Sequence, residues 1–123
     1  QILRGTIFRQ SNPAVVGVMV LDGKLMTGVQ LMRSDGVRVG EVKSIQSEGE
    51  NVQEAGKNKE VAISIPKVTV GRQIDEEMIL YSDLSESEFI KLKQLKSFLN
   101  KDEIGILKEI AEIKRKTKTL WGI

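Results

Sequence analysis

The sequence of 123 residues contains no cysteine and no histidine. Disulfide frameworks and thiolate metal sites are therefore excluded, and so are zinc sites built from imidazole. No serine has a histidine to act as its base, which removes the usual route to nucleophilic catalysis. The Gly-x-x-x-x-Gly-Lys-Ser/Thr loop that cradles phosphates in many nucleotide hydrolases is also missing. These absences favour a binding module with neither a catalytic residue nor a bound metal.

A strong charge of one sign and long apolar runs are missing as well. The 19 Lys and Arg residues against 17 Asp and Glu give a net charge of +2, so any contact with nucleic acid should be local. No apolar run reaches the roughly 18 residues of a membrane span, and no signal-peptide pattern is present. We expect a cytoplasmic location. Because strand-like sequence begins at Gln1, we also expect a fragment of a larger protein.

Residues 2–82 consist of short β-rich runs separated by turn signals. The turn signals include Asn12-Pro13, Asp22-Gly23 and Asp35-Gly36. This spacing predicts a mainly β unit, a small antiparallel β-barrel over residues 1–84. Asp-Gly pairs are typical of two-residue hairpins, so the runs on either side of each should pair antiparallel. The polar stretch 48–59 predicts a loop or a weak hairpin outside the core.

Beyond Leu84 the apolar period changes from two to about three and a half. Ser85 and Glu88 have the spacing of a capping box, which predicts a helix start. The expected apolar stripe of this helix is Phe89, Leu92, Leu95 and Leu99. A second helix should be capped by Asn100 or Asp102, with a stripe of Ile106, Leu107, Ile110 and Ile113. Residues 85–123 should form a helical pair packed on the barrel, with either a covered seam or an open groove.

The excess of basic residues is concentrated near the C-terminus. Lys114, Arg115, Lys116 and Lys118 form a basic run just before Trp121. Cations are favoured in a last helical turn, where they complement the helix dipole, so this run is consistent with a solvated helix end. Contact with ribosomal RNA phosphate is the alternative.

Five stretches of the sequence resemble those of one known family, in the same order along the chain. They are FRQSNPAVVGV, GKLMTG, RVGEVKSIQ, EVAISI and VGRQIDEEMILYSDL. From about Leu3 to Trp121 the chain resembles the C-terminal domain, domain IV, of the archaeal and eukaryotic translation initiation factor of the two/five-B type. That factor is related to bacterial initiation factor two. The resemblance implies a barrel like the second domain of elongation-type GTPases, followed by two C-terminal helices.

The resemblance also implies a function. In this family the parent protein is a GTPase that supports ribosomal subunit joining, and its GTP and Mg²⁺ are bound by an N-terminal G domain. The fragment should therefore be no enzyme and hold no cofactor of its own. Domain IV is expected to contact the methionylated CCA end of initiator tRNA on the ribosome. The alternative is a protein-interaction module whose terminal helices bind the C-terminal tail of initiation factor one A.

Two polar segments are the candidate tRNA-binding residues. Pro13 fixes its own φ and restricts the preceding residue, so the residues before it should form an ordered polar rim. Eukaryotic family members have a glycine-arginine-histidine stretch where this chain has Gly71-Arg72-Gln73, so the histidine ring is lost and the arginine stays. A capped hairpin with a solvent-facing arginine is the alternative interpretation. The candidate set is Arg9, Gln10, Ser11, Asn12, Arg72 and Gln73.

The two helices carry the second candidate site. They offer more apolar surface than one seam between short helices hides, and flanking lysines would suit an acidic-hydrophobic peptide. In the alternative arrangement Trp121 and the tail fold back and fill the groove. The candidate set is Phe89, Leu92, Lys93, Lys96, Ile106, Lys108, Ile110 and Trp121.

Overall fold

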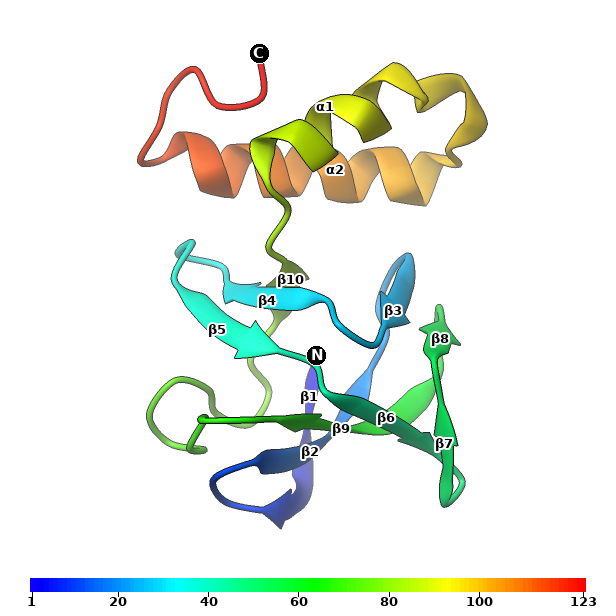
Figure 1. Cartoon of the computed structure of the whole chain (residues 1–123), viewed down its shortest axis with the longest axis vertical. Helices are drawn as coiled ribbons and strands as arrows, with labels where there is room; N and C mark the ends of the chain where they lie inside the picture. The colour runs from blue at the N-terminus through cyan, green and yellow to red at the C-terminus, as the bar shows by residue number, and fades with distance from the viewer.

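The computed structural model describes all residues from 1 to 123 and contains ten strands followed by helices (Figure 1). The strands are β1 (Ile2–Arg9), β2 (Ala14–Met19), β3 (Lys24–Met26), β4 (Gln30–Arg33), β5 (Arg38–Glu41), β6 (Ser44–Ser47), β7 (Glu50–Val52), β8 (Glu54–Gly56), β9 (Glu60–Ile65) and β10 (Leu80–Ser82). The helices are α1 (Glu86–Gln94), the short 3₁₀ helix η1 (Lys96–Phe98) and α2 (Lys101–Arg115). No helix has the length and apolar character that crossing a bilayer requires.

The strands form three antiparallel sheets around one apolar core. Their orders are β1-β2-β9-β6-β7, β10-β4-β5 and β3-β8. Strand β9 shows why the core forms, because Val61, Ile63 and Ile65 alternate with more exposed residues and all point to one face. The predicted mainly β unit followed by two helices is confirmed. The predicted closed barrel is not found, because the hydrogen-bonded ladders form three separate sheets rather than one continuous ring.

One of the two predicted Asp-Gly hairpins forms. Gly36 has φ +87° in the turn between β4 and β5, which pair antiparallel. The hairpin predicted at Asp22-Gly23 is wrong, because β2 already pairs with β1 and β9 and has no free edge for β3. Gly23, at φ +73°, instead turns the chain out of the five-stranded sheet, and β3 pairs with β8. The stretch 48–59 forms no hairpin of its own, because β7 pairs with β6 and β8 pairs with β3. The prediction that it lies outside the core is wrong at Ala55, which is buried.

Both predicted helix starts are confirmed in detail. Ser85 and Asn100 each form a complete capping box, with Glu88 and Glu103 as their partners. The predicted first stripe is wrong at Leu95 and Leu99, because α1 ends at Gln94 and both residues lie beyond it. Leu95 is 50% exposed. The turn into η1 thus rotates Leu95 away from the face that Phe89 buries.

The helices lie as a layer over the sheets (Figure 1) and share a second apolar cluster with β4. This cluster contains Met32, Phe89, Ile110, Ala111, Ile113 and Trp121. The chain after α2 folds back, and the Phe89 and Trp121 ring centroids lie 4.7 Å apart. Gly122, at φ +76°, permits this close approach, because a Cβ there would meet the Phe89 ring at 2.7 Å. The tail therefore covers the Phe89 side of the helical pair.

A buried carboxylate ties the helical layer to the sheets. Asp83 is 9% exposed and lies in the link between β10 and α1. Arg38 on β5 donates through Nε to Asp83 at 2.7 Å, and Lys114 on α2 donates to its other oxygen. Burial alone raises the pKa of Asp83, but the hydrogen bonds from Lys114 and Arg38 outweigh burial and hold its pKa below the ordinary value.

Candidate nucleic-acid interface

The structure brings the two predicted tRNA-binding segments together at one end of the sheets. We call residues 9–12 and 69–73 the polar rim. The backbone N–H of Val70 donates to Gln10 O at 2.9 Å, and that of Asn12 donates to Val68 O at 3.2 Å. Ser11 and Thr69 form an isolated antiparallel bridge. Segments that lie about 60 residues apart in the sequence thus form one continuous surface.

Buried side chains and special backbone conformations fix the rim in place. Val68, Val70 and Ile74 are each at most 5% exposed and anchor the second segment in the main core. Asn12 has φ +48° and Gly71 has φ +94°. Asparagine and glycine are the residues that adopt this left-handed region most readily, so the local sequence suits both turns.

Three of the six predicted side chains form hydrogen bonds within the rim. Gln10 donates through Nε2 to Val70 O at 2.7 Å, and the hydroxyls of Ser11 and Thr69 lie 2.9 Å apart. Gln73 accepts through Oε1 from the Thr69 N–H at 3.0 Å. These bonds engage one side-chain polar atom each of Gln10, Ser11 and Gln73, which gives these residues a structural role in the rim, while Gln10 Oε1 and Gln73 Nε2 make no hydrogen bond within the chain.

The two arginines of the rim differ in their surroundings. Arg9 is exposed and donates to the carbonyls of its own loop, at 3.2 Å to Ser11 O and 3.3 Å to Asn12 O. Arg72 is exposed, and its side chain makes no hydrogen bond or ion pair. The rim itself contains no acidic residue. A planar donor group free to bind phosphate is therefore present at Arg72, with a second, partly engaged one at Arg9.

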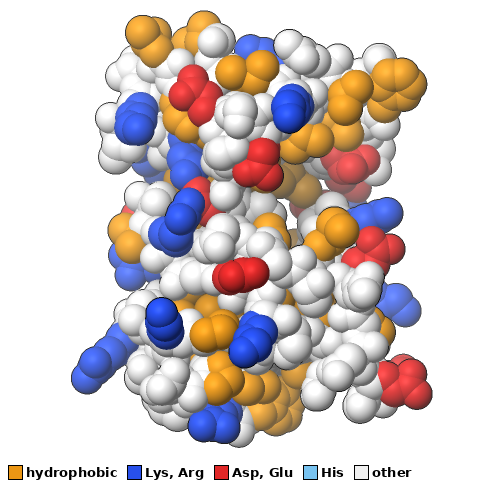
Figure 2. Space-filling model, viewed as in Figure 1, with side chains coloured by type: hydrophobic (Ala, Val, Ile, Leu, Met, Phe, Trp, Pro, Cys, Tyr) orange, Lys and Arg blue, Asp and Glu red, His pale blue; other side chains and the backbone are white.

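Two residues next to the rim were not predicted. Phe8 is 67% exposed beside Arg9, and Lys67 is exposed beside Val68 with φ +62°. Figure 2 shows apolar side chains with Lys and Arg side chains around them at this lower end of the molecule. Strand periodicity gave no signal for Phe8, because β1 contains two register shifts that break the alternation of its faces.

The predicted partner-binding residues are divided between two environments. Phe89 and Trp121 pack on each other in the helical cluster, and Lys93 donates to Gly122 O at 3.4 Å in the same tail. Leu92 and Ile106 instead line a shallow groove of about 180 Å³ that reaches Gly23 in the β2–β3 turn. Ile110 belongs to both, because it is buried in the helical cluster and also borders the groove. Lys96 and Lys108 are exposed.

Comparisons with known proteins identify the family. A family model described as "Elongation factor Tu domain 4" matches residues 1–81. The chain is 50% identical over its whole length to a "Probable translation initiation factor IF-2" of Methanopyrus kandleri, covering 21% of that protein. It is 46% identical over its whole length to the corresponding protein of Hyperthermus butylicus, covering 20% of it.

A solved structure has the same fold. In the structure described as GDP-bound aIF5B from Aeropyrum pernix, 99% of this chain superposes with a TM-score of 0.92 at 37% identity, over 21% of that protein. The present chain thus spans about a fifth of the length of these relatives. The chain belongs to the elongation factor Tu domain 4 family, and over its whole length it is similar to one fifth of the archaeal IF-2 (aIF5B) translation initiation factors.

Proposed function

We propose that this domain contacts the methionylated CCA end of initiator tRNA through the polar rim. The observation that carries the proposal is the joining of residues 9–12 and 69–73 into one fixed surface that presents Arg9 and Arg72. Guanidinium groups form short charge-assisted hydrogen bonds with phosphate. A single-stranded RNA end offers phosphates and unstacked bases together, and the exposed Phe8 ring beside Arg9 suits such bases.

The nearly balanced charge of the chain fits a local contact of this kind. A net charge of +2 gives little sequence-independent attraction for long RNA. A few directed contacts at one RNA end do not need such attraction. In our proposal the domain therefore reads a chemically distinct end, and the rest of the tRNA and the ribosome are bound by other parts of the factor.

The larger protein supplies the remaining activity in this proposal. The Aeropyrum relative is described as GDP-bound, and this chain matches only 21% of it. We infer that the parent protein is a GTPase whose separate G domain holds GTP and Mg²⁺ and that it supports ribosomal subunit joining. The domain itself would contribute recognition rather than catalysis, in the cytoplasm where translation takes place.

Replacing Arg72 tests the proposed contact. Arg72→Ala should weaken binding of methionylated initiator tRNA by roughly 1 to 3 kcal/mol, because one charge-assisted contact is lost. The fold should be unchanged, since the side chain is exposed and makes no hydrogen bond or ion pair within the chain. Arg4→Ala is the matched control, because Arg4 lies on β1 outside the polar rim and its side chain is 84% exposed. A fluorescence titration in which both variants bind like the unchanged domain would remove Arg72 from the site.

The groove beside the helices favours a second candidate function. Leu92, Ile106 and Ile110 line it, and the lysines of the helical pair could orient an acidic-hydrophobic segment. The candidate occupant is the C-terminal tail of initiation factor one A. A synthetic peptide of that tail should shift the amide signals of Leu92 and Ile106 in an NMR titration. Shifts confined to the sheets, or none at millimolar peptide, would exclude this groove as the binding site.

A further inference from the structure

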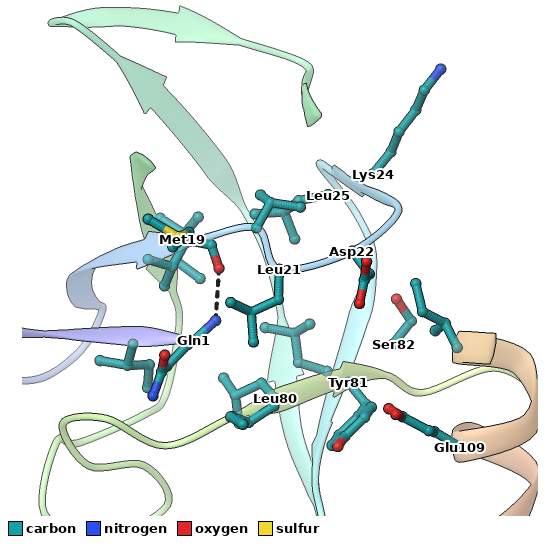
Figure 3. Close-up of a pocket in the computed structure, with 17 residues that line it drawn as sticks. Gln1, Met19, Leu21, Asp22, Lys24, Leu25, Leu80, Tyr81, Ser82 and Glu109 are labelled. Atoms are coloured by element: carbon teal, nitrogen blue, oxygen red, sulfur yellow. Dashed lines mark hydrogen bonds between the residues drawn. The ribbon is translucent and has the colours of Figure 1, made fainter. Parts of the chain in front are cut away.

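The apolar residues of the helical layer point in two directions. On the side that faces the sheets, α2 borders a cavity of about 260 Å³, where Glu109 lies beside Tyr81 of β10 (Figure 3). Leu92 lines the groove described above. These residues belong to the packing of the helices on the sheets. Leu95 and Phe98 line neither the cavity nor the groove, so they belong to a different surface.

This second surface is the turn that joins the two helices. We call residues 91–101 the helical tip. Phe98 is 83% exposed, more than any other large apolar residue of the chain, and Leu95 is 50% exposed. Figure 2 shows apolar side chains at the upper right of the molecule, over this turn (Figure 1). Exposed apolar side chains that adjoin one another add nothing to the core, and they can be covered only by a partner.

The local backbone places three side chains of the tip in one row. The Leu95 N–H donates to Lys91 O at 3.2 Å, and the Phe98 N–H donates to Leu95 O at 2.8 Å. The first bond closes an α-helical turn, and side chains four positions apart on such a turn lie on the same face. The second bond closes a 3₁₀ turn, in which side chains three positions apart eclipse one another. Lys91, Leu95 and Phe98 therefore form a continuous strip of a cation, an aliphatic group and an aromatic ring.

The helical tip carries only positive charge. Its charged residues are Lys91, Lys93, Lys96 and Lys101, and the tip contains no acidic residue. Lys93 donates to Gly122 O at 3.4 Å. The other three, which we call the free lysines, are exposed, and their side chains make no hydrogen bond or ion pair within the chain. A cluster of unpaired cations of this kind attracts a polyanion.

Two contacts hold the tip in one conformation. Asn100 caps α2 in a complete capping box with Glu103. Lys57, between β8 and β9, donates to Asp102 at 2.6 Å and ties the start of α2 to the sheets. The strip is therefore presented in a fixed orientation, which lowers the conformational entropy that its backbone loses on binding.

We propose that the helical tip binds a single-stranded segment of ribosomal RNA, with a base stacked on the Phe98 ring and phosphates beside the free lysines. Single-stranded RNA combines closely spaced phosphates with bases that are free to stack on aromatic side chains. A base can stack on one face of a protruding ring. An acidic-hydrophobic peptide instead needs a groove for its side chains, and Phe98 lines neither the cavity nor the groove.

The position of the tip separates this RNA from the tRNA end. The helical tip and the polar rim lie at opposite ends of the long axis of the molecule (Figure 1). The choice of ribosomal RNA rests on the proposed function, which assigns the tRNA end to the rim and the factor to the ribosome. The tip then adds one local contact to the ribosome binding that the other parts of the factor provide.

A short RNA strand tests the stacking contact. A fluorescein-labelled adenosine strand of about ten nucleotides is titrated with domain that carries Arg9→Ala and Arg72→Ala, so that the polar rim does not contribute. Adding Phe98→Leu should weaken binding at least about five-fold, because an apolar side chain remains but the ring is lost. Phe98→Trp should bind at least as tightly as the parent. Equal binding by Phe98→Leu, or no binding at millimolar protein, would overturn the proposal.

The free lysines are tested by the salt dependence of the same titration. Lys96→Gln should weaken binding about three-fold at low salt and make the slope of log K against log salt less steep by about 0.7, because one phosphate contact is lost. Lys43→Gln is the matched control, since it removes the same charge from an exposed lysine between β5 and β6. Equal effects of the two variants would show an undirected attraction and overturn the proposed contact.

A peptide of alternating glutamate and leucine represents the other class of partner. It should bind the tip more weakly than the RNA strand does. If the peptide bound more tightly than the RNA, and bound Phe98→Leu as well as the parent, the tip would be a peptide site and the RNA proposal would fail.

Cross-linking on the ribosome identifies the RNA and separates this proposal from the proposed function. The photoreactive substitution Phe98→p-benzoylphenylalanine in the longer factor should cross-link to ribosomal RNA, and the same substitution at Phe8, beside the polar rim, should cross-link to initiator tRNA. Absence of ribosomal RNA among the cross-links from the tip would overturn the present proposal. If the tip reaches ribosomal RNA but the Phe8 probe does not reach tRNA, the proposed function fails and the tip contact stands.

Discussion

The sheets and the helical layer bury their apolar residues in different ways. The sheets enclose one cluster of 15 buried residues drawn from the strands and loops of residues 2–74. The helical layer shares a cluster of six, of which Met32 belongs to β4 and Trp121 to the returning tail. The sheets therefore have a core of their own, while the helices depend on one strand and on the tail. We expect the helical layer to be the less stable of the two regions.

The largest expected effect comes from breaking the helical cluster. Trp121→Ala removes the ring that packs on Phe89 and should lower the free energy of unfolding of the helical layer by about 3 to 5 kcal/mol. Hydrogen exchange should then show faster exchange in α1 and α2, with β2 and β9 still protected. Leu120→Ala is the neighbouring control, because Leu120 is 75% exposed. If the strands lost protection in parallel with the helices, the two regions would be one cooperative unit.

The second effect comes from the carboxylate that joins the two regions. Asp83→Asn should cost about 2 kcal/mol of stability, because Lys114 loses its buried partner. The folded pKa of Asp83 lies below its ordinary value of 3.8. Its stabilising contribution is therefore complete above pH 3.8 and is lost as the pH falls through the folded pKa. Urea unfolding between pH 7 and pH 2 measures this loss.

Asp83→Asn supplies the control for that pH series. Other carboxylates also titrate at low pH, so the unchanged domain and the variant must be compared at each pH. Their difference in unfolding free energy should shrink as the pH falls below 3.8. A difference that stays constant down to pH 2 would show that the charge of Asp83 does not hold the helical layer on the sheets.

The smallest expected effect is a loss of tRNA binding at the polar rim, which belongs to the sheets and not to the helical layer. The loss of tRNA-binding free energy in Arg9→Ala should be less than half of the loss in Arg72→Ala. The reason is that Arg9 already donates to the Ser11 and Asn12 carbonyls. Denaturant unfolding of the helical layer should not change. Parallel tRNA titrations of the two variants make the comparison. A larger loss for Arg9→Ala would reverse our ranking of the two arginines.

The features that the sequence predicted correctly depend on neighbours within one segment. The capping box of Ser85 and Glu88 involves residues three positions apart and is formed as expected, and Asn100 proves to be the cap of α2 out of the two candidates Asn100 and Asp102. The buried alternation of β9 likewise follows from a period of two. Such patterns are readable because the local backbone alone decides which side chains meet.

The features that the sequence missed depend on contacts between distant segments. The hairpin at Asp22-Gly23 fails because β9, some 40 residues later, occupies the edge of β2 that β3 would need. Asp83 becomes a link only because Arg38 and Lys114 arrive from other elements. At the candidate site, the sequence identified both segments of the rim but could not separate Arg72 from Gln10 and Gln73. That distinction requires knowing which donors and acceptors the fold has already paired.

The internal pairing of Gln10, Ser11 and Gln73 has a consequence for the thermodynamics of association. These side chains are held by hydrogen bonds before any RNA arrives, so they lose little rotamer freedom when a complex forms. The unfavourable conformational entropy of binding should then come mainly from the single-stranded RNA end and from the Arg72 side chain. An RNA end already constrained into its bound shape would therefore associate more tightly without any change in the protein.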